Sequence, residues 1–240
     1  FNSVRFFVGF LALIPFYIIL EKKNTLNIIS KNKNRFIYLS VMVGIFLFFA
    51  SVFQQVALLY TDVANAAFFT IFYVPMVPII VFFLFKKKIH WSVWPAVLLC
   101  VFGGYFLTNF QDATVRLGDT LVLICALFWA LHIIFIGIII EEFNAPILIG
   151  LIQTFVVSIC SLVLAILFEN FVLRDIMDQK IQILYAGVLS GGIAFVLQIY
   201  AQRKIKPAPA AIIFSLEGVF ATIAAWILLS QILNFNNILG

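Results

Sequence analysis

Glu217 is the residue whose type and position suggest chemistry most directly. It is the only charged residue in the apolar run 207–229. A charge near the centre of a bilayer costs roughly 2.5–3.5 kcal/mol, so we expect Glu217 to face a cavity or a protein partner. An apolar environment favours the neutral form of a carboxyl, which makes Glu217 a candidate for proton coupling and substrate binding. The alternative is a protonated carboxyl that bonds a backbone carbonyl and only holds helices together.

A second apolar run, 63–85, matches the first when the sequence is shifted by 143 residues. The matched pairs are Gln55 with Gln198, Val74 with Glu217, and Pro75 with Gly218. Proline removes a backbone donor and crowds the carbonyl four residues earlier, so we expect the helix to open near Pro75 and Pro78. Paired interruptions in two halves are typical of a transporter's binding site. We therefore predict a binding site here, with Pro75, Pro78 and Gly218 as hinges.

Further candidate substrate-binding residues surround these interruptions. Asn65 and Tyr73 lie eight residues apart and share one helix face, and Tyr73 has an aromatic ring with a hydroxyl that suits a mixed apolar and polar pocket. An interhelical hydrogen bond is an equal alternative. The matched amides Gln55 and Gln198 can donate and accept hydrogen bonds, either toward a ligand or between helices.

Trp129 and His132 are three residues apart and share a helix face. They are candidates for lining a substrate cavity, with packing against neighbouring helices as the alternative. Arg5 lies near the start of the first apolar run, where it either snorkels to the surface or meets an anionic group.

No residue pattern predicts a cofactor, a metal site or an enzyme. There are only two histidines, and the three cysteines lie in separate apolar runs without metal or redox spacing. We expect the cysteines to serve as small packing residues. A membrane enzyme would need His, Asp, Glu, Ser or Cys clustered near one interface, and the carboxylates here are scattered.

The composition indicates a polytopic α-helical membrane protein that positions these residues. Hydrophobic residues make up 65% and charged residues 10% of the chain, against roughly 45–50% and 25% in soluble domains. We expect eight spans and the start of a ninth: 4–20, 36–60, 63–85, 91–109, 119–140, 145–168, 181–202, 207–229 and 235–240. The net charge of +5 resides in short loops, so it does not indicate nucleic-acid binding.

The basic residues predict the orientation in the plasma membrane. Eleven of the 15 lie in the solvated loop 21–35 and in 86–90 and 203–206, and three lie in the opposite set of loops. Lys and Arg accumulate on cytoplasmic loops, so we place the basic loops 21–35, 86–90 and 203–206 in the cytoplasm. The first span then runs inward, which requires a partner helix before it unless the true N-terminus is exported, and we expect one missing upstream helix. With that helix the protein would have two sets of five helices. Because each set has an odd number of helices, the second set would be inverted in the membrane relative to the first.

The ordered motifs resemble the EamA-type family of the drug/metabolite transporter superfamily. They comprise GVLSGGIAFVLQIYAQRKIKPAPAAIIFSLEGVFATIAAWILLSQ (187–231), ANAAF (64–68) followed by Tyr73, GD (118–119) leading to FWAL (128–131), and VRF (4–6). Three positions depart from the family pattern: Gly218 replaces a proline, Ser230-Gln231 replaces Gly-Glu, and His132 replaces a tyrosine.

The resemblance implies ten helices in two inverted five-helix repeats, with the first helix missing and the last truncated here. Residues 1–112 would form the first repeat (helices 2–5) and 118–240 the second (helices 6–9 and the start of 10). It also implies a permease that moves small metabolites, such as amino-acid-like compounds or other small organic solutes, by alternating access and often outward.

We therefore predict a secondary transporter whose partners are a small-molecule substrate and the lipid bilayer. The sequence contains no nucleotide-binding loop or soluble ATPase domain, so we expect the energy to come from gradients or downhill flow. The first alternative is a non-transporting membrane scaffold, although the longest loops reach only about a dozen residues. The second, less favoured alternative is a polytopic membrane enzyme. The oligomeric state stays open between monomer and homodimer.

Overall fold

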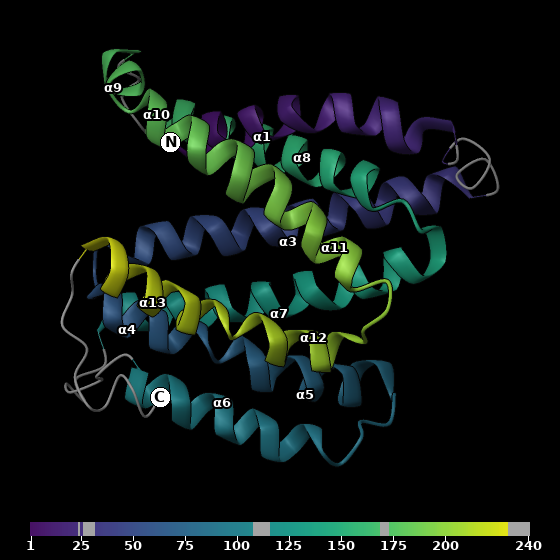
Figure 1. Cartoon of the computed structure of the whole chain (residues 1–240), viewed down its shortest axis with the longest axis vertical. Helices are drawn as coiled ribbons and strands as arrows, with labels where there is room; N and C mark the ends of the chain where they lie inside the picture. Colours follow the sequence, from purple (N-terminus) through teal and green to yellow (C-terminus); the bar gives the residue numbers. More distant parts are fainter. Residues whose placement is uncertain (24, 26–31, 108–115, 169–172, 230–240) are drawn as a thin grey trace. The chain divides into compact units, whose positions relative to one another are not determined.

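The protein has an all-α membrane fold, which confirms the predicted class. The computed structural model describes residues 1–23, 25, 32–107, 116–168 and 173–229, and within them the regular structure is helical (Figure 1). In this part of the chain seven helical stretches are long and apolar enough to cross a membrane: Asn2–Glu21, Lys33–Ala57, Asn65–Phe85, Leu117–Phe143, Pro146–Phe168, Lys180–Ala201 and Pro207–Ala224.

The predicted fourth span is a shorter apolar helix than expected, Val93–Phe106. The predicted ninth span, 235–240, lies outside the described residues, so it stays a prediction.

The helices form two compact units, and each unit draws on both halves of the sequence. Unit 1 comprises Phe1–Phe49 and Phe135–Ile205, and unit 2 comprises Ala50–Ile134 and the chain from Lys206 onward. The boundaries of the predicted repeats, 1–112 and 118–240, therefore do not coincide with the compact units. Whether the two repeats are related by inversion stays a prediction.

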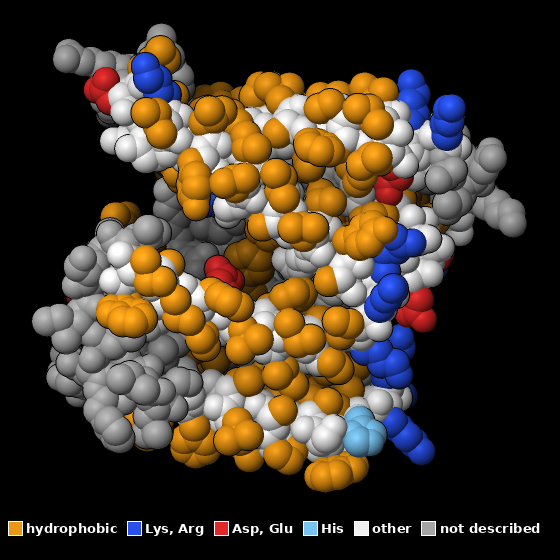
Figure 2. Space-filling view, in the orientation of Figure 1, with side chains coloured by type: hydrophobic (Ala, Val, Ile, Leu, Met, Phe, Trp, Pro, Cys, Tyr) orange, Lys and Arg blue, Asp and Glu red, His pale blue; other side chains and the backbone are white. Residues whose placement is uncertain are grey.

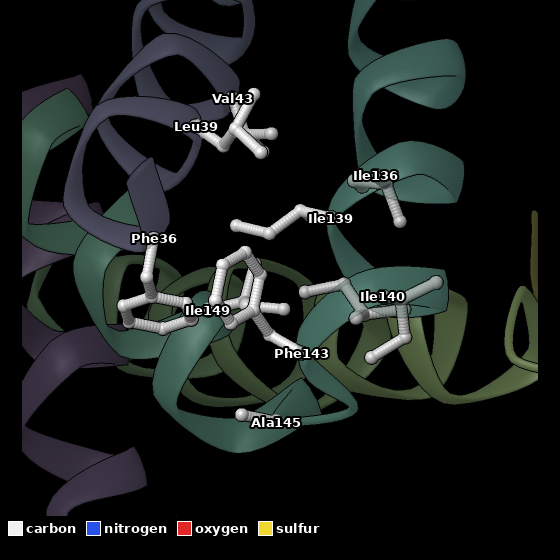
Figure 3. Packing of buried hydrophobic residues seen from close by; sticks show 10 residues of the cluster. Phe36, Leu39, Val43, Ile136, Ile139, Ile140, Phe143, Ala145 and Ile149 are labelled. Atoms are coloured by element: carbon white, nitrogen blue, oxygen red, sulfur yellow. The ribbon is translucent and has the colours of Figure 1, made fainter. Parts of the chain in front are cut away.

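The core of unit 1 forms where four of its helices meet. The elements of unit 1 include α1 (Asn2–Phe16), the first part of α3 (Lys33–Ala57), the last part of α7 (Leu117–Phe143), α8 (Pro146–Phe168) and α11 (Phe195–Ala201). Aliphatic and aromatic side chains from α3, α7 and the start of α8 point toward one another (Figure 3). Phe36 and Phe143 meet edge to face with ring centroids 5.1 Å apart, a favoured aromatic geometry.

Two segments of unit 1 are π-helical, which the sequence did not predict. The segment η1 (Tyr17–Glu21) follows α1, and η2 (Ala186–Ala194) joins α10 (Lys180–Tyr185) to α11. The short helix α9 (Leu173–Asp178) precedes α10. Glycines bring η2 and α1 into backbone contact: a Cβ at Gly187 would lie 2.7 Å from the Arg5 carbonyl oxygen, and one at Gly9 would lie 2.8 Å from the Gly187 oxygen. Small residues allow this close approach of helices in membranes.

Glu21 ties the end of η1 to the start of α8. Its carboxylate accepts hydrogen bonds from the amides of Ile147 (3.3 Å) and Leu148 (2.7 Å), in the first turn of α8. These amides have no partner within the helix, and the helix dipole favours a negative charge there. The side chain is only 8% exposed, so the prediction that Glu21 opens a solvated loop is wrong.

Unit 2 contains the interrupted spans. Its elements are the end of α3, α4 (Val63–Thr70), α5 (Tyr73–Phe85), α6 (Val93–Leu107), the first part of α7, α12 (Pro207–Phe214) and α13 (Glu217–Leu229).

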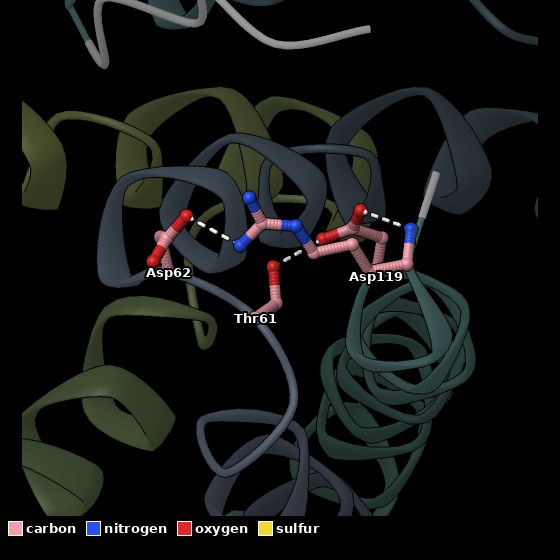
Figure 4. A network of polar contacts seen from close by, with 4 residues as sticks. Thr61, Asp62 and Asp119 are labelled. Carbon is pink, nitrogen blue, oxygen red and sulfur yellow. Dashed lines mark hydrogen bonds and ion pairs between the residues drawn. The ribbon is translucent and has the colours of Figure 1, made fainter. Parts of the chain in front are cut away.

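A polar network fixes the turn between α3 and α4 to the start of α7 (Figure 4). Thr61 donates its hydroxyl to Asp119, whose other carboxylate oxygen accepts the Arg116 amide at 2.8 Å. Arg116 also pairs with Asp62 at 2.6 Å. Asp119 is 1% exposed and bonds back to the amide at the helix start, as in a capping box.

The surfaces of both units carry large apolar side chains suited to lipid contact. Figure 2 shows hydrophobic side chains over the helices, whereas Lys and Arg side chains gather at helix ends. Phe83, Leu99 and Ile166 are each at least 70% exposed. Lipid tails would solvate such residues without the cost that water imposes.

Candidate functional site

The third predicted span is interrupted between α4 and α5, as the prolines suggested. The amide of Phe72 bonds the carbonyl three residues earlier at 3.2 Å, and Val74 does the same to Ile71 at 2.9 Å. Pro75 lies four residues after Ile71, where its ring would crowd the Ile71 carbonyl and it has no amide to bond it. The interruption therefore falls at residues 71–72, and Pro75 occupies the first turn of α5.

The eighth predicted span is interrupted at the matched depth, between α12 and α13. The amides of Leu216 and Gly218 bond carbonyls three residues earlier, each at 3.2 Å. The Ser215 hydroxyl donates to the Ile212 carbonyl at 2.7 Å. Serine hydroxyls compete in this way with the regular helical ladder. A hydroxyl-to-carbonyl hydrogen bond thus accompanies both interruptions, since Thr70 donates to the Ala66 carbonyl at 2.7 Å beside the first one, which proline also accompanies.

Within unit 2 the two interrupted spans pack together. α5 contacts α12, and α6 contacts α5, α12 and α13. Figure 1 shows α5 and α12 side by side. The basic run 86–88 follows the last residue of α5, and Lys206 precedes the first residue of α12. The chain therefore leaves α5 and enters α12 through basic residues. α6 also approaches the first interruption closely, because Gly104 lies against the side chain of Ile71.

Four polar side chains gather where these helices meet. Tyr73, the first residue of α5, lies close enough to Glu217 and Cys100 for electrostatic interaction. The Ser215 hydroxyl oxygen and the Cys100 sulfur lie 3.4 Å apart. Glu217 begins α13, and its side chain is accessible at the surface of unit 2. We call these four residues the interruption cluster.

The interruption cluster can bind a group that donates hydrogen bonds or carries positive charge. A carboxylate accepts hydrogen bonds at two oxygens, and hydroxyl groups both donate and accept. Val74, the residue that matches Glu217 in the first half, is fully buried, so the two matched positions differ in exposure.

Trp129 and His132 form a pair on α7, as their spacing predicted. Their rings meet edge to face with centroids 5.7 Å apart, and His132 is fully buried. One turn earlier, the Cys125 thiol donates to the Ala50 carbonyl at 3.2 Å. This places the pair in unit 2, beside the contact between α7 and α3. A cavity-lining role for the pair stays a prediction.

The predicted amide residues lie on three separate elements. Asn65 lies in α4 and is 6% exposed, and its amide nitrogen has no hydrogen-bond partner among the described residues. Gln55 is exposed in the last turn of α3, in unit 2, whereas Gln198 is half-buried in α11, in unit 1. The structure thus brings Tyr73 and Glu217 together and leaves the roles of the three amides as predictions.

Sequence reasoning did not assign Ser215 and Cys100 to the site. Hydroxyl and thiol groups occur throughout membrane helices as packing residues, so their type carries little signal. One signal is the position of Ser215, two residues before Glu217. A serine hydroxyl there can bond a helix carbonyl and so compete with the backbone amide that would otherwise bond it. Among the described residues, no group of three or more His, Cys, Asp or Glu side chains could hold a metal ion.

An all-helical membrane protein with two interrupted spans and a small polar cluster between them has the features of a membrane transporter. Comparison with known proteins gives the same class. The family model of EamA-like transporters matches residues 116–240. An uncharacterized transporter of Archaeoglobus fulgidus is 32% identical over 97% of this chain and 70% of its own length. The chain belongs to the EamA-like transporter family.

The fold is also found in a solved structure. The crystal structure of another protein matches this fold with a TM-score of 0.78 at 13% sequence identity. The match covers 99% of this chain and 80% of the chain in that structure. This likeness concerns the fold alone.

Proposed function

We propose that the protein is a secondary transporter that moves small organic solutes, such as amino-acid-like metabolites, outward across the plasma membrane by alternating access. The observation that carries the proposal is the interruption cluster, where two broken spans from opposite halves of the sequence pack together. Broken helices expose backbone polar groups at membrane depth, which is tolerated only where they face protein or a watery cavity.

Glu217 is the proposed centre of the transport cycle. Its carboxyl alternates between binding a proton and binding a hydrogen-bond donor or cationic group of the solute. Tyr73 supplies a hydroxyl and an apolar ring for the same solute. Pro75, Pro78 and Gly218 flank the interruptions, where the missing ladder bonds leave the backbone free to bend.

The orientation proposed from the basic loops places 86–90 and 203–206 in the cytoplasm. Within unit 2, the end of α5 and the start of α12 both carry basic residues and the two helices are in contact, which supports a common side for these loops. Loop 21–35 is assigned to the same side by the same rule.

A flux measurement tests the function and the role of Glu217 together. The full-length protein is screened in overproducing cells for metabolites that leave or enter faster, and the solute found is then followed in proteoliposomes over a pH series. We expect Glu217→Gln to fold normally, since the amide keeps size and polarity. Its flux should fall by about tenfold or more, as expected when a charge-assisted contact worth at least 1.4 kcal/mol is lost, or it should lose its pH dependence.

The matched control is Glu141→Gln, which removes an exposed carboxylate near the end of α7. Its flux should equal that of the wild type. Unchanged flux and pH response in Glu217→Gln would reject the carrier role of Glu217. An absence of flux for every solute screened would reject the transport function itself.

A further inference from the structure

Arg5 carries a positive charge inside the first span. It lies in the first part of α1, within the apolar stretch Asn2–Glu21. Three residues separate it from the start of the helix, about 5 Å along the helix axis. An arginine at this depth normally pairs with a carboxylate, bonds to backbone carbonyls or extends to the interface.

Among the described residues, the helices that pack most extensively on α1 offer no carboxylate to Arg5. α1 contacts α8, η2, α10 and η1. The first three contain no Asp or Glu, and neither does α1 itself. The acid of η1, Glu21, lies at the opposite end of the span and bonds the amides of α8. The two ion pairs seen among the described residues, Arg35–Glu142 and Arg116–Asp62, do not involve Arg5.

Both the guanidinium and the backbone of Arg5 contact neighbouring groups. The guanidinium carbon lies 4.8 Å from the centre of the ring of Phe6, which is fully buried and lies near Phe195. The backbone of Arg5 packs against η2 so closely that a Cβ added at Gly187 would lie 2.7 Å from the Arg5 carbonyl oxygen. The Nε atom is shielded from solvent and has no hydrogen-bond partner among the described residues.

This arrangement differs from that of an arginine that only extends toward water. A buried donor without a partner costs free energy, more so when it is charged. The half-buried side chain leaves the outer edge of the guanidinium accessible while Nε stays enclosed. The planar fork of arginine matches the two oxygens of a carboxylate or a phosphate.

We infer that Arg5 forms a binding site for an oxyanion, a carboxylate or phosphate group presented to the accessible edge of its guanidinium. The group belongs either to a solute, in which case the inference extends the proposed transport function, or to an anionic lipid headgroup, which requires no transport. Because binding and flux are measured separately, failure of one does not imply failure of the other.

The test follows the reaction of phenylglyoxal with individual arginines of the full-length wild-type protein. The protein is held in phosphatidylcholine nanodiscs, and peptide mass spectrometry gives the modification rates at Arg5 and Arg35. Arg35 is the internal control, because it lies in the same unit and already pairs with Glu142 at 2.9 Å. The probes are sodium acetate and sodium phosphate, each compared with sodium chloride at equal ionic strength.

We expect a probe to slow modification at Arg5 and leave the rate at Arg35 unchanged. At a probe concentration of twice its Kd the slowing should be about threefold, since mass action leaves a third of the sites free. Protection by acetate or phosphate in phosphatidylcholine identifies a solute site. Protection that requires nanodiscs containing phosphatidylglycerol identifies a lipid site. Either result supports the inference.

A second measurement uses thermal stability. The protecting probe should raise the Tm of the wild type and of Arg35→Gln, and it should not raise the Tm of Arg5→Gln. Equal slowing at Arg5 and Arg35 overturns the inference, and so does the absence of slowing by acetate, by phosphate and by phosphatidylglycerol. An Arg5 that phenylglyoxal never modifies, as expected if another carboxylate of the full-length protein already occupies it, overturns the inference as well.

Discussion

At the scale of single residues, Glu21 shows that a carboxylate can cap a helix that lies far from it in the sequence. It accepts two amides at the start of α8, 126 and 127 residues away. Such bonds replace the side chain that usually caps a helix locally, and within the described residues Ala145 and Pro146 at the helix start have no oxygen in their side chains.

Glu21→Ala should therefore destabilise unit 1. Loss of a helix cap costs about 0.5–2 kcal/mol, and the two amides would be left without their acceptor. We expect a lower Tm for the purified protein, whereas Glu141→Ala, an exposed carboxylate near the end of α7, should leave Tm unchanged. Equal Tm values for Glu21→Ala and the wild type would show that water replaces the carboxylate.

Sequence reasoning located some site residues and missed others for identifiable reasons. Glu217 and Tyr73 were predicted, because a charge in an apolar run and an aromatic beside a proline are rare enough to signal a role. Cys100 and Ser215 were missed, because their contact joins α6 to a span 115 residues away. Glu21 was assigned to a loop, since the sequence does not show that η1 continues the helix.

At the scale of elements, the position of an interruption depends on the carbonyl that proline crowds. We expected the helix to open near Pro75 and Pro78, and it opens four residues before Pro75. The sequence did not predict the π-helical segments, because a wider turn leaves the apolar pattern of a fully hydrophobic helix unchanged. Gly104 lies against the side chain of Ile71, as expected where small residues let helices approach closely.

Pro75→Ala should restore a donor for the Ile71 carbonyl and make the third span more regular. We expect slower amide hydrogen exchange at residues 71–76, because a bonded amide exchanges only after local opening, and we expect lower flux. Pro95→Ala is the matched control, since Pro95 is also the third residue of its helix, α6. Unaltered exchange at 71–76 would mean that packing, and not Pro75, sets the interruption.

The contact between α1 and η2 predicts opposite effects for two neighbouring glycines. A Cβ at Gly187 would lie 2.7 Å from a backbone oxygen, whereas one at Gly191 would have its nearest neighbour at 3.5 Å. Gly187→Ala should cost about 1–3 kcal/mol through overpacking. Gly191→Ala should be neutral or should stabilise by up to about 1 kcal/mol, because alanine loses less backbone entropy. Thermal unfolding of both variants decides, and equal Tm shifts would contradict the close contact.

At the scale of the whole molecule, the composition was sufficient to predict a polytopic helical membrane protein. The division into two units was not predicted. Repeats are recognised from similarity along the sequence, whereas compact units depend on contacts such as that between α5 and α12, whose residues are far apart in the chain. The repeat boundaries and the orientation remain predictions.

Cysteine labelling tests the proposed orientation. Cysteines replacing Lys87 or Lys204 should react with a membrane-impermeant maleimide only when the cytoplasmic side is open. A cysteine replacing Arg174 should react in intact cells, because its loop belongs to the set with few basic residues. The unsubstituted protein, with Cys100, Cys125 and Cys160, measures the background. Reaction of the Lys87 cysteine in intact cells would reverse the orientation.

The sharing of both sequence halves between the two units has a consequence for biosynthesis. The partner of α5 in unit 2, α12, begins at residue 207 and leaves the ribosome more than a hundred residues later. Until then the broken span α4–α5 lacks this partner. Contacts between such distant segments slow folding, so we expect the two broken spans to pack together late in biosynthesis.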